Sequence, residues 1–573
     1  MKRVFGYLAK FKKEAIPAPL FKMLEATFEL LVPLVVKSLV DVGIRNADKP
    51  YIFGMCGLLV LFCIIGFVSA ATAQYFSAKA AVGVTTELRH DMFEKVQRFC
   101  HAELDTVGIS NTLTRMTSDL SQVQTGINMT LRLLLRSPFI VFGAMILAFT
   151  IDVRCALIFA VGIPLLLAVV FAVTLVTVPM FRRVQSKLGD VLKSTRGSLV
   201  GARVIRAFCA EDLMTREFDD ENDLLTSMQK KAARISVLLN PLTYLIINAA
   251  VIVLIWTGAV RMEAGLLTQG ALLALYDYMS QILIELIKFA NFIVTVTKSV
   301  ASAERIDEFM ASGDPRTVPD APRDADKPYI SFDHVSFHYP RGGDVLHDIS
   351  FTANRGETVG IIGGTGSGKT TLVNLIPRYY DATGGEVAVD GLDVRAYPGD
   401  DLQRKVGYVP QKAVLFRGSI RDNMRWGKAD ATDAEIVDAI TRAQGEDILR
   451  AKGSLDAAVV EGGKNFSGGQ RQRLTIARAL VRKPEILILD DSASALDYAT
   501  DARLRATIRA AENPPTTFIV SQRAASVMHA DKIIVLDDGA AVGIGRHEEL
   551  LETCPVYREI YDSQFRKGDA ADD

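Results

Sequence analysis

Apolar stretches alternate with charged segments along the first half of the chain. Six of these stretches are long enough to cross a bilayer as helices, which takes about 20 residues. They cover residues 19–43, 51–77, 128–151, 155–179, 236–260 and 268–297. The connections between them are alternately short and long, so the pattern predicts an all-α bundle of six spans whose large loops share one face.

The two long connections, residues 78–127 and 180–235, are rich in charge but also carry apolar residues at helical spacing. We therefore expect the spans to continue as helices beyond the membrane. Lysine and arginine gather in these connections, which predicts that they and both chain termini are cytoplasmic. Residues 1–20 mix apolar and basic positions without a signal-peptide core, so they predict a short helix in the membrane interface, with a disordered basic tail as the alternative.

Charged residues inside the predicted spans are costly in lipid, so they should face the bundle interior, an aqueous cavity or the interface. They are Glu25, Glu29, Lys37, Arg132, Arg136, Glu285 and Lys288. The three glutamates are the stronger candidates for a substrate pathway. The basic residues could equally extend to the interface or pair with acidic neighbours.

After about residue 300 the pattern changes to short apolar strands, turns and helices, which is typical of a soluble α/β domain. The Pro- and Asp-rich stretch before it predicts a linker over 306–328, between a membrane domain (1–305) and an α/β nucleotide-binding domain (329–573). Composition agrees with this division, since 49% of residues are hydrophobic although 23% are charged. The net charge of −1 gives no basic field that would favour nucleic acid.

The sequence GGTGSGKT follows a predicted strand and precedes an apolar helix, which is the context that a phosphate-binding loop requires. Its backbone N–H groups and the helix dipole would hold phosphate oxygens. We expect Lys369 to reach the β- and γ-phosphates and the Thr370 hydroxyl to bind Mg²⁺. The residues expected at the nucleotide are Gly363, Gly364, Thr365, Gly366, Ser367, Gly368, Lys369, Thr370 and Thr371.

A second motif, ILILDDSASALD, supplies two adjacent acids after an apolar strand. The strand over 486–489 would deliver Asp490 at its C-terminal end, where α/β sheets bind ligands, and Asp490 would hold Mg²⁺. The next residue, Asp491, would face the γ-phosphate and the attacking water. Together the two motifs predict a site for ATP and Mg²⁺.

Between these motifs, EGGKNFSGGQRQR resembles the signature region of the ATP-binding cassette (ABC) family, and the whole chain looks like an ABC exporter half-transporter, two of which form one pump. The resemblance implies an adenine-stacking Tyr339 and a Gln411 that touches Mg²⁺ and the membrane half. It also implies a signature that closes on ATP held by the other cassette, made of Phe466, Ser467, Gly468, Gly469 and Gln470. A loop that crosses the dimer interface matches Ser494, Ala495, Leu496 and Asp497. Segments 206–218 and 108–120 resemble the loops that dock on the cassettes.

Two positions depart from the family pattern. The family has glutamate as its catalytic carboxylate and histidine as its switch residue, where this chain has Asp491 and Gln522. Aspartate is one methylene shorter, so its carboxylate lies back by more than about an ångström, and such misplacement can lower a rate about a hundredfold. Glutamine cannot carry a proton as histidine does. Both changes together predict a site that binds ATP and hydrolyses it poorly.

The intact signature makes most sense if it completes a competent site on a different partner chain, which predicts a heterodimeric exporter in a bacterial inner membrane. A homodimer in which Asp491 acts as a slow base is the alternative. An importer built on the exporter scaffold, for instance for an iron chelate, and an ATP-gated regulator that transports nothing also stay open. The sequence does not identify the transported drug, lipid or peptide.

Overall fold

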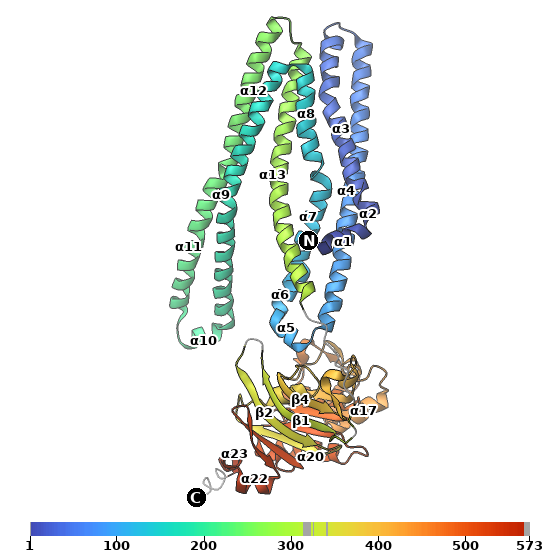
Figure 1. Ribbon diagram of the computed structural model, residues 1–573, viewed down its shortest axis with the longest axis vertical. Coiled ribbons are helices and arrows are strands. Elements are labelled where there is room, and N and C mark those ends of the chain that lie inside the picture. Colours follow the sequence, from blue (N-terminus) through green and yellow to red (C-terminus); the bar gives the residue numbers. More distant parts are fainter. Residues whose placement is uncertain (1, 313–322, 325, 340–341, 566–573) are drawn as a thin grey trace. The chain divides into compact units, whose positions relative to one another are not determined.

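The computed structural model describes residues 2–312, 323–324, 326–339 and 342–565 (Figure 1). The chain divides into two compact units. The first contains Met1–Gln97 and Ser110–Ala311, and the second contains Arg98–Ile109 and Ser312–Asp573. The fold class predicted from the sequence is confirmed, because a helical apolar unit is followed by an α/β unit that contains a largely parallel six-stranded sheet and an antiparallel four-stranded sheet.

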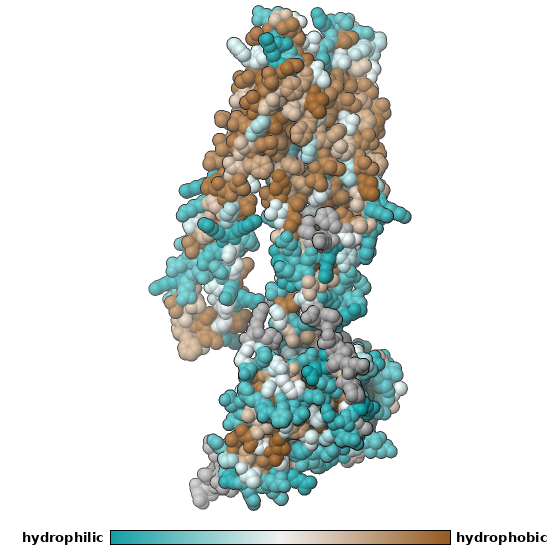
Figure 2. All heavy atoms as spheres, viewed as in Figure 1, coloured by the Kyte–Doolittle hydropathy of each residue, from teal (hydrophilic) through white to brown (hydrophobic). Residues whose placement is uncertain are grey.

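The first unit is entirely helical over its described residues (Figure 1). Its elements are α1 (Lys2–Lys10), α2 (Lys12–Ala15), α3 (Pro17–Ser38), the π-helical turn η1 (Leu39–Ile44), α4 (Lys49–Arg98), α6 (Ile109–Thr114), the π-helical turn η2 (Arg115–Asp119), α7 (Leu120–Leu133), α8 (Arg136–Ile151), α9 (Val153–Val200), α10 (Ala202–Ala207), α11 (Glu211–Val237), α12 (Leu239–Glu263) and α13 (Gln269–Ala311). Figure 2 shows apolar residues gathered along one part of these helices and polar residues towards their ends.

Among the described residues, five helical segments are long and apolar enough to cross a membrane: Lys49–Arg98, Ile109–Ile151, Val153–Val200, Glu211–Glu263 and Gln269–Ala311. They include the second to sixth predicted spans. The first, 19–43, is helical across α3 and η1 but is not among the five segments. Its sequence carries Lys22, Glu25, Glu29 and Lys37, and this first span remains a prediction.

Ion pairs inside the helical unit join α3, α8 and α13. Arg136 is 6% exposed and donates to Glu285 and to Glu29, each at 2.6 Å. Lys288 and the Ser137 hydroxyl also donate to Glu285, at 2.8 and 3.0 Å. This set of contacts ties Glu285 to its neighbours and favours a structural role for it over a place in a substrate pathway.

The second unit begins with a short helix from the first half of the chain, α5 (His101–Val107). Its strands are β1 (Ile330–His338), β2 (Asp344–Ala353), β3 (Thr358–Gly363), β4 (Gly384–Val389), β5 (Leu392–Asp393), β6 (Val406–Val409), β7 (Gly418–Ser419), β8 (Ala458–Val459), β9 (Ile486–Asp490), β10 (Thr516–Val520), β11 (Lys532–Asp537) and β12 (Ala540–Gly545). Its helices are α14 (Lys369–Leu375), η3 (Val394–Ala396), α15 (Asp401–Lys405), α16 (Ile420–Arg425), α17 (Asp433–Arg442), α18 (Glu446–Lys452), η4 (Glu461–Gly463), α19 (Gly468–Leu480), α20 (Tyr498–Arg509), α21 (Ala524–Val527), α22 (His547–Thr553) and α23 (Pro555–Phe565).

The central sheet has the strand order β12-β11-β3-β10-β9-β6 among the described residues. All neighbouring pairs are parallel except β11 and β12. Every residue of β9 and β10 is buried, as expected where helices cover both faces of a parallel sheet. The predicted linker differs from the structure at its start, because residues 306–311 continue α13, while 313–322 and 325 lie outside the described residues. The domain boundaries remain predictions.

Candidate functional site

The sequence motifs meet at the C-terminal edge of the central sheet. Four neighbouring strands, β3, β10, β9 and β6, run parallel and end at this edge. The phosphate loop follows β3, Gln522 follows β10, Asp490 ends β9, and Gln411 follows β6. Since ligands bind at this edge of open α/β sheets, the fold assembles the predicted nucleotide site from four separate parts of the sequence.

The phosphate loop depends on glycine at defined positions. Gly366 and Gly368 have φ values of 87° and 92°, in the left-handed region that favours glycine. At Gly363 a Cβ atom would lie 2.1 Å from the Leu536 carbonyl oxygen of β11. Gly364 has no such neighbour within 4 Å. Glycine is therefore required at the start of the loop by packing and farther along by backbone conformation.

Lys369 is 8% exposed, and its ammonium lies inside the loop. It donates to the Gly363 carbonyl oxygen at 3.0 Å, to that of Gly364, and to the Ser367 hydroxyl at 3.2 Å. Burial lowers the pKa of Lys369, and the nearby charges of Asp490 and Asp491 oppose this shift. A buried ammonium of this kind suits an anionic ligand such as a nucleotide phosphate.

The residues predicted to hold Mg²⁺ fit that ion in their chemistry. Thr370 donates its hydroxyl to Asp490 Oδ1 at 2.9 Å, and Tyr408 donates to Asp490 Oδ2 at 3.1 Å. Asp490 is 2% exposed, and burial raises its pKa although both hydroxyl groups oppose the shift. A buried carboxylate beside a hydroxyl is an oxygen donor set that Mg²⁺ accepts. When held by Asp490 and Thr370, the ion would neutralise negative charge on the nucleotide phosphates.

Asp491 lies directly beside this pair in an unusual backbone conformation, with φ of 46°. Its N–H donates to the Val520 carbonyl oxygen of β10 at 3.0 Å. Its carboxylate accepts a hydrogen bond from Gln411 Nε2 at 3.3 Å. Two predicted site residues from different strand ends are thus in direct contact.

Gln522 is exposed after β10, and its backbone carbonyl accepts from Gln564 Nε2 at 2.8 Å. The next residue, Arg523, donates to the carbonyl oxygens of Ala493, Ser494 and Leu496, at 3.2–3.4 Å. This contact joins the Gln522 segment to the predicted interface loop. Asp497 ends that loop by accepting from the Thr500 N–H and capping α20.

The predicted signature forms the start of α19. Phe466 is buried in the domain core, whereas Ser467 and Gly468 are exposed, and Gly469 and Gln470 are half-buried. The Ser467 hydroxyl accepts from the Gln470 N–H at 3.2 Å, and the Gln470 side chain accepts from the Ser467 N–H at 3.0 Å. This reciprocal cap holds an exposed helix N-terminus ready for an anion.

Tyr339 lies beside the helix that follows the phosphate loop. Its hydroxyl is 3.0 Å from the Thr371 hydroxyl, and its ring meets the Tyr380 ring edge-on at 5.2 Å. This position is compatible with the predicted contact to adenine. The roles of Tyr339, the signature and the interface loop remain predictions.

The contact that α5 makes within the second unit was not predicted from the sequence. The His101 ring stacks on the Tyr379 ring at 4.2 Å, and Tyr380 donates its hydroxyl to Asp105 at 2.6 Å. The predicted docking segment 108–120 begins one residue after this helix. Gly108, with φ of 78°, ends α5 and was a usable signal for a separate short helix.

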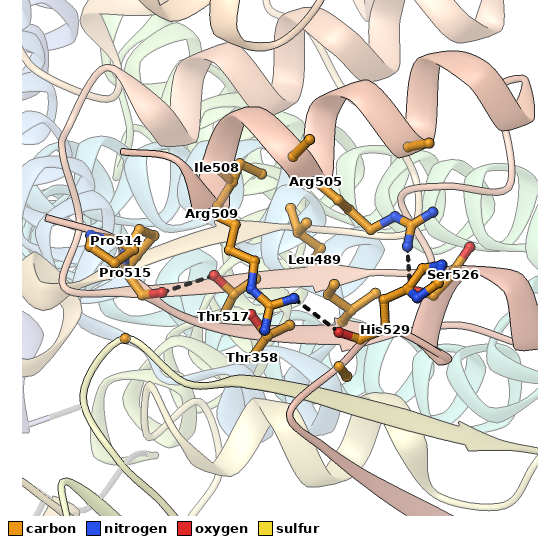
Figure 3. Close-up of a pocket in the computed structure, with 15 residues that line it drawn as sticks. Thr358, Leu489, Arg505, Ile508, Arg509, Pro514, Pro515, Thr517, Ser526 and His529 are labelled. Atoms are coloured by element: carbon orange, nitrogen blue, oxygen red, sulfur yellow. Dashed lines mark hydrogen bonds between the residues drawn. The ribbon is translucent and has the colours of Figure 1, made fainter. Parts of the chain in front are cut away.

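A cavity of about 300 Å³ lies under α20, and Leu489 of β9 is among the residues that line it (Figure 3). Its lining includes Thr358 and Thr517 near the starts of β3 and β10, and Arg505 and Arg509 of α20. Arg505 donates to the Ser526 carbonyl oxygen at 3.2 Å, and Arg509 to that of His529 at 3.1 Å (Figure 3). None of the predicted nucleotide-site residues lines it, so this cavity is separate from the candidate site.

Comparisons with known proteins agree with the assembled site. Residues 16–286 match the family model for the ABC transporter transmembrane region, and residues 346–494 match that for the ABC transporter. An uncharacterized ABC transporter ATP-binding protein of Mycobacterium tuberculosis is 36% identical over 560 residues, 95% of each chain. A putative multidrug export ATP-binding/permease protein of Bacillus subtilis, YgaD, is 31% identical over 98% of this chain and 99% of its own length.

A solved structure of a bacterial Atm1-family ABC exporter with ATP bound superposes with a TM-score of 0.82, covering 97% of this chain and 99% of that chain. At 24% sequence identity this likeness shows the fold alone. The family models and the relatives that match over nearly the full length carry the assignment. The chain belongs to the ABC transporter family, as a membrane-spanning exporter-type chain fused to its own ATPase, which binds ATP to drive transport.

Proposed function

We propose that this chain is one half of a heterodimeric ABC exporter, in which its own ATP site hydrolyses poorly and its signature completes a competent site on the partner. Half-transporters of this family work as dimers. The relative named as a putative multidrug export protein favours export, with drugs as the substrate class. In this arrangement both termini and the nucleotide-binding domain are cytoplasmic, and the helical unit spans the inner membrane.

The observation that carries the proposal is the arrangement around Asp491. Its short carboxylate accepts a hydrogen bond from Gln411, and Gln522 stands at the end of the neighbouring strand. A catalytic carboxylate must lie within hydrogen-bond reach of the attacking water, and a shift of about 1 Å can reduce the rate about a hundredfold. The shortened acid and the replaced histidine therefore weaken the same reaction at the same site.

The signature supports the second half of the proposal, because its features are those of a working anion site. The reciprocal cap between Ser467 and Gln470 is intact, and the N-terminus of α19 is exposed. Its helix packs on α16, α17 and β6, while the phosphate loop is held by β3 and α14. A chain that combines a well-formed signature with a weakened catalytic pair is expected when its signature serves the nucleotide bound by another chain.

The turn between α9 and α11 supports dimerisation. Leu199, Val200, Val204 and Phe208 are 60–83% exposed around α10. Large exposed apolar residues at one tip mark an interaction surface more often than a solvent-facing turn. We assign this tip to contact with a partner subunit; of the four residues, Phe208 lies in segment 206–218, which resembles a loop that docks on the cassettes.

The test compares ATP turnover of the purified chain with that of Asp491→Glu, Gln522→His and the double variant, all in lipid nanodiscs. Asp491→Glu restores the missing methylene, so we expect the double variant to gain roughly tenfold to a hundredfold in turnover. Lys369→Ala, which removes the lysine expected to bind the phosphates, provides the background rate of ATP turnover. High turnover by the unchanged chain, lowered by both substitutions, would identify Asp491 as a working base in a homodimer.

Direction is tested by ATP-dependent uptake of fluorescent drugs and labelled lipids into inverted membrane vesicles. An exporter accumulates its substrate in inverted vesicles, because their outer face carries the cassettes. An importer built on the same scaffold would accumulate it only in right-side-out vesicles.

A further inference from the structure

Tyr408 is a half-buried tyrosine of β6 that the proposed reaction does not use. Its hydroxyl donates to Asp490 Oδ2 at 3.1 Å, while Thr370 occupies the other carboxylate oxygen at 2.9 Å. Both oxygens of the predicted magnesium ligand are therefore bound by hydroxyl groups. Strand β6 pairs with β9 in parallel, with Tyr408 opposite Ile488, two residues before Asp490 along β9.

The ring of Tyr408 continues this contact away from the site. It meets the Tyr379 ring edge-on at 5.4 Å, and Tyr379 in turn stacks on His101 of α5 at 4.2 Å. Helix α5 is fixed further by the hydrogen bond from Tyr380 to Asp105, at 2.6 Å. An unbroken series of side-chain contacts thus runs from α5 to Asp490, inside the second unit.

The hydroxyl donors and the ring contacts in this series restrict the orientation of the Asp490 carboxylate. A buried carboxylate without a donor rotates and loses the orientation that a metal ligand needs, and partners of metal ligands commonly change metal affinity by tenfold to a hundredfold. The aromatic contacts restrict where the Tyr408 hydroxyl can lie, because edge-on and stacked rings have preferred geometries. A shift of α5 would therefore reach Asp490 through two ring contacts and one hydrogen bond.

We propose that Tyr408 is a positioning residue that orients Asp490 for Mg²⁺ and links that carboxylate to helix α5 through Tyr379. The inference rests on the predicted role of Asp490 as a magnesium ligand. It does not depend on whether the partner chain is the same or different, so its failure is distinguishable from failure of the heterodimer.

The direct test is Tyr408→Phe in the full chain, purified with any partner that accompanies it. This change removes the hydroxyl and keeps the ring. We measure binding of a fluorescent ATP analogue while Mg²⁺ is titrated, and again in excess EDTA. The Mg²⁺ concentration for half-maximal binding should rise about tenfold, while affinity in EDTA stays unchanged.

Tyr397→Phe is the matched control, because the Tyr397 hydroxyl is buried and donates to a carbonyl oxygen, that of Val389, at 2.8 Å. It should lower the melting temperature without nucleotide about as much as Tyr408→Phe, and leave the Mg²⁺ dependence unchanged. An unchanged Mg²⁺ dependence in Tyr408→Phe, or an equal change in both variants, would overturn the proposal.

The link to α5 is tested by a double-mutant cycle with His101→Ala. In the otherwise unchanged chain, His101→Ala should raise the Mg²⁺ concentration for half-maximal binding about threefold. In the Tyr408→Phe variant, the same substitution should leave that concentration unaltered. Effects of His101→Ala that are equal in the two backgrounds would contradict the link, and so would the absence of any effect.

Discussion

The backbone conformation of Asp491 and the hydrogen bond to its carboxylate both constrain this residue. Its φ of 46° lies in the left-handed region, which aspartate adopts more readily than most residues with longer side chains. Its carboxylate is bound by Gln411 rather than directed at open space. A short acid is therefore well accommodated in this backbone conformation.

The first glycine of the phosphate loop provides a sharp test of packing at a single residue. Gly363→Ala would place a Cβ atom 2.1 Å from the Leu536 carbonyl oxygen, so β3 and β11 must separate. We expect a loss of about 1–3 kcal/mol in the free energy of unfolding, and weaker ATP binding. Gly364→Ala is the control, since no atom lies within 4 Å of the position that its Cβ would take. Equal melting temperatures for the two variants would show that the close packing is wrong.

Motif residues could be identified from sequence because their spacing along one strand and one loop defines them. The contacts between residues of different motifs could not be predicted from the sequence. Gln411 and Asp491 are 80 positions apart, and Tyr408 and Asp490 are 82 apart. Only the order of strands in the sheet brings such residues together, and the local pattern does not encode that order.

Among the helices and strands, the cap of α19 should matter for stability and for turnover in different ways. Ser467→Ala removes the cap and is expected to cost about 1 kcal/mol in the free energy of unfolding. It should also lower ATP turnover of the assembled transporter at least tenfold if, as proposed, the signature completes the partner's site. Melting and steady-state ATPase assays measure the two effects.

Thr432→Ala is the control for this prediction, because Thr432 and Glu435 cap α17 with the same reciprocal geometry. It should cost a similar amount of stability and leave turnover within about twofold. If both variants lose turnover equally, the loss comes from general destabilisation and the signature has no special role.

The ion pairs among α3, α8 and α13 lead to a third prediction. Arg136→Gln leaves the buried Glu285 with Lys288 as its remaining cation among the described residues, so we expect a loss of about 3 kcal/mol in stability. Melting of the detergent-purified protein measures it. Arg132→Gln, near the end of α7, is the comparison because Arg132 takes part in none of the salt bridges that join Arg136, Lys288 and their acidic partners. A larger loss for Arg132→Gln would contradict the assigned role of Arg136.

The helical elements were predictable where apolar residues dominate, and less so where charges pair across helices. The first span is interrupted in its pattern by charged residues, and one of them, Glu29, is bound by Arg136, 107 positions away. Helix α5 was missed for a related reason. Its docking depends on Tyr379 and Tyr380, which lie far along the chain and carry no signal for it in the local sequence.

For the molecule as a whole, the heterodimer predicts unequal effects of two substitutions on the assembled transporter. Asp491→Asn removes a carboxylate from the weak site and should change ATP turnover by less than about twofold, whereas Ser467→Ala acts on the competent site. Steady-state ATPase activity of the purified complex measures both. Abolition of turnover by Asp491→Asn would mean that this chain's own site performs the hydrolysis.

The proposed function depends above all on two different chains building the pump. Its sharpest test is affinity purification of this chain, tagged at its native level, from its own membranes in mild detergent, with identification of co-purifying proteins by mass spectrometry. We expect a second half-transporter in equal amount, with glutamate and histidine at the positions that match Asp491 and Gln522. Recovery of a homodimer alone would refute the heterodimer and would make Asp491 and Gln522 the working residues of a symmetric pump.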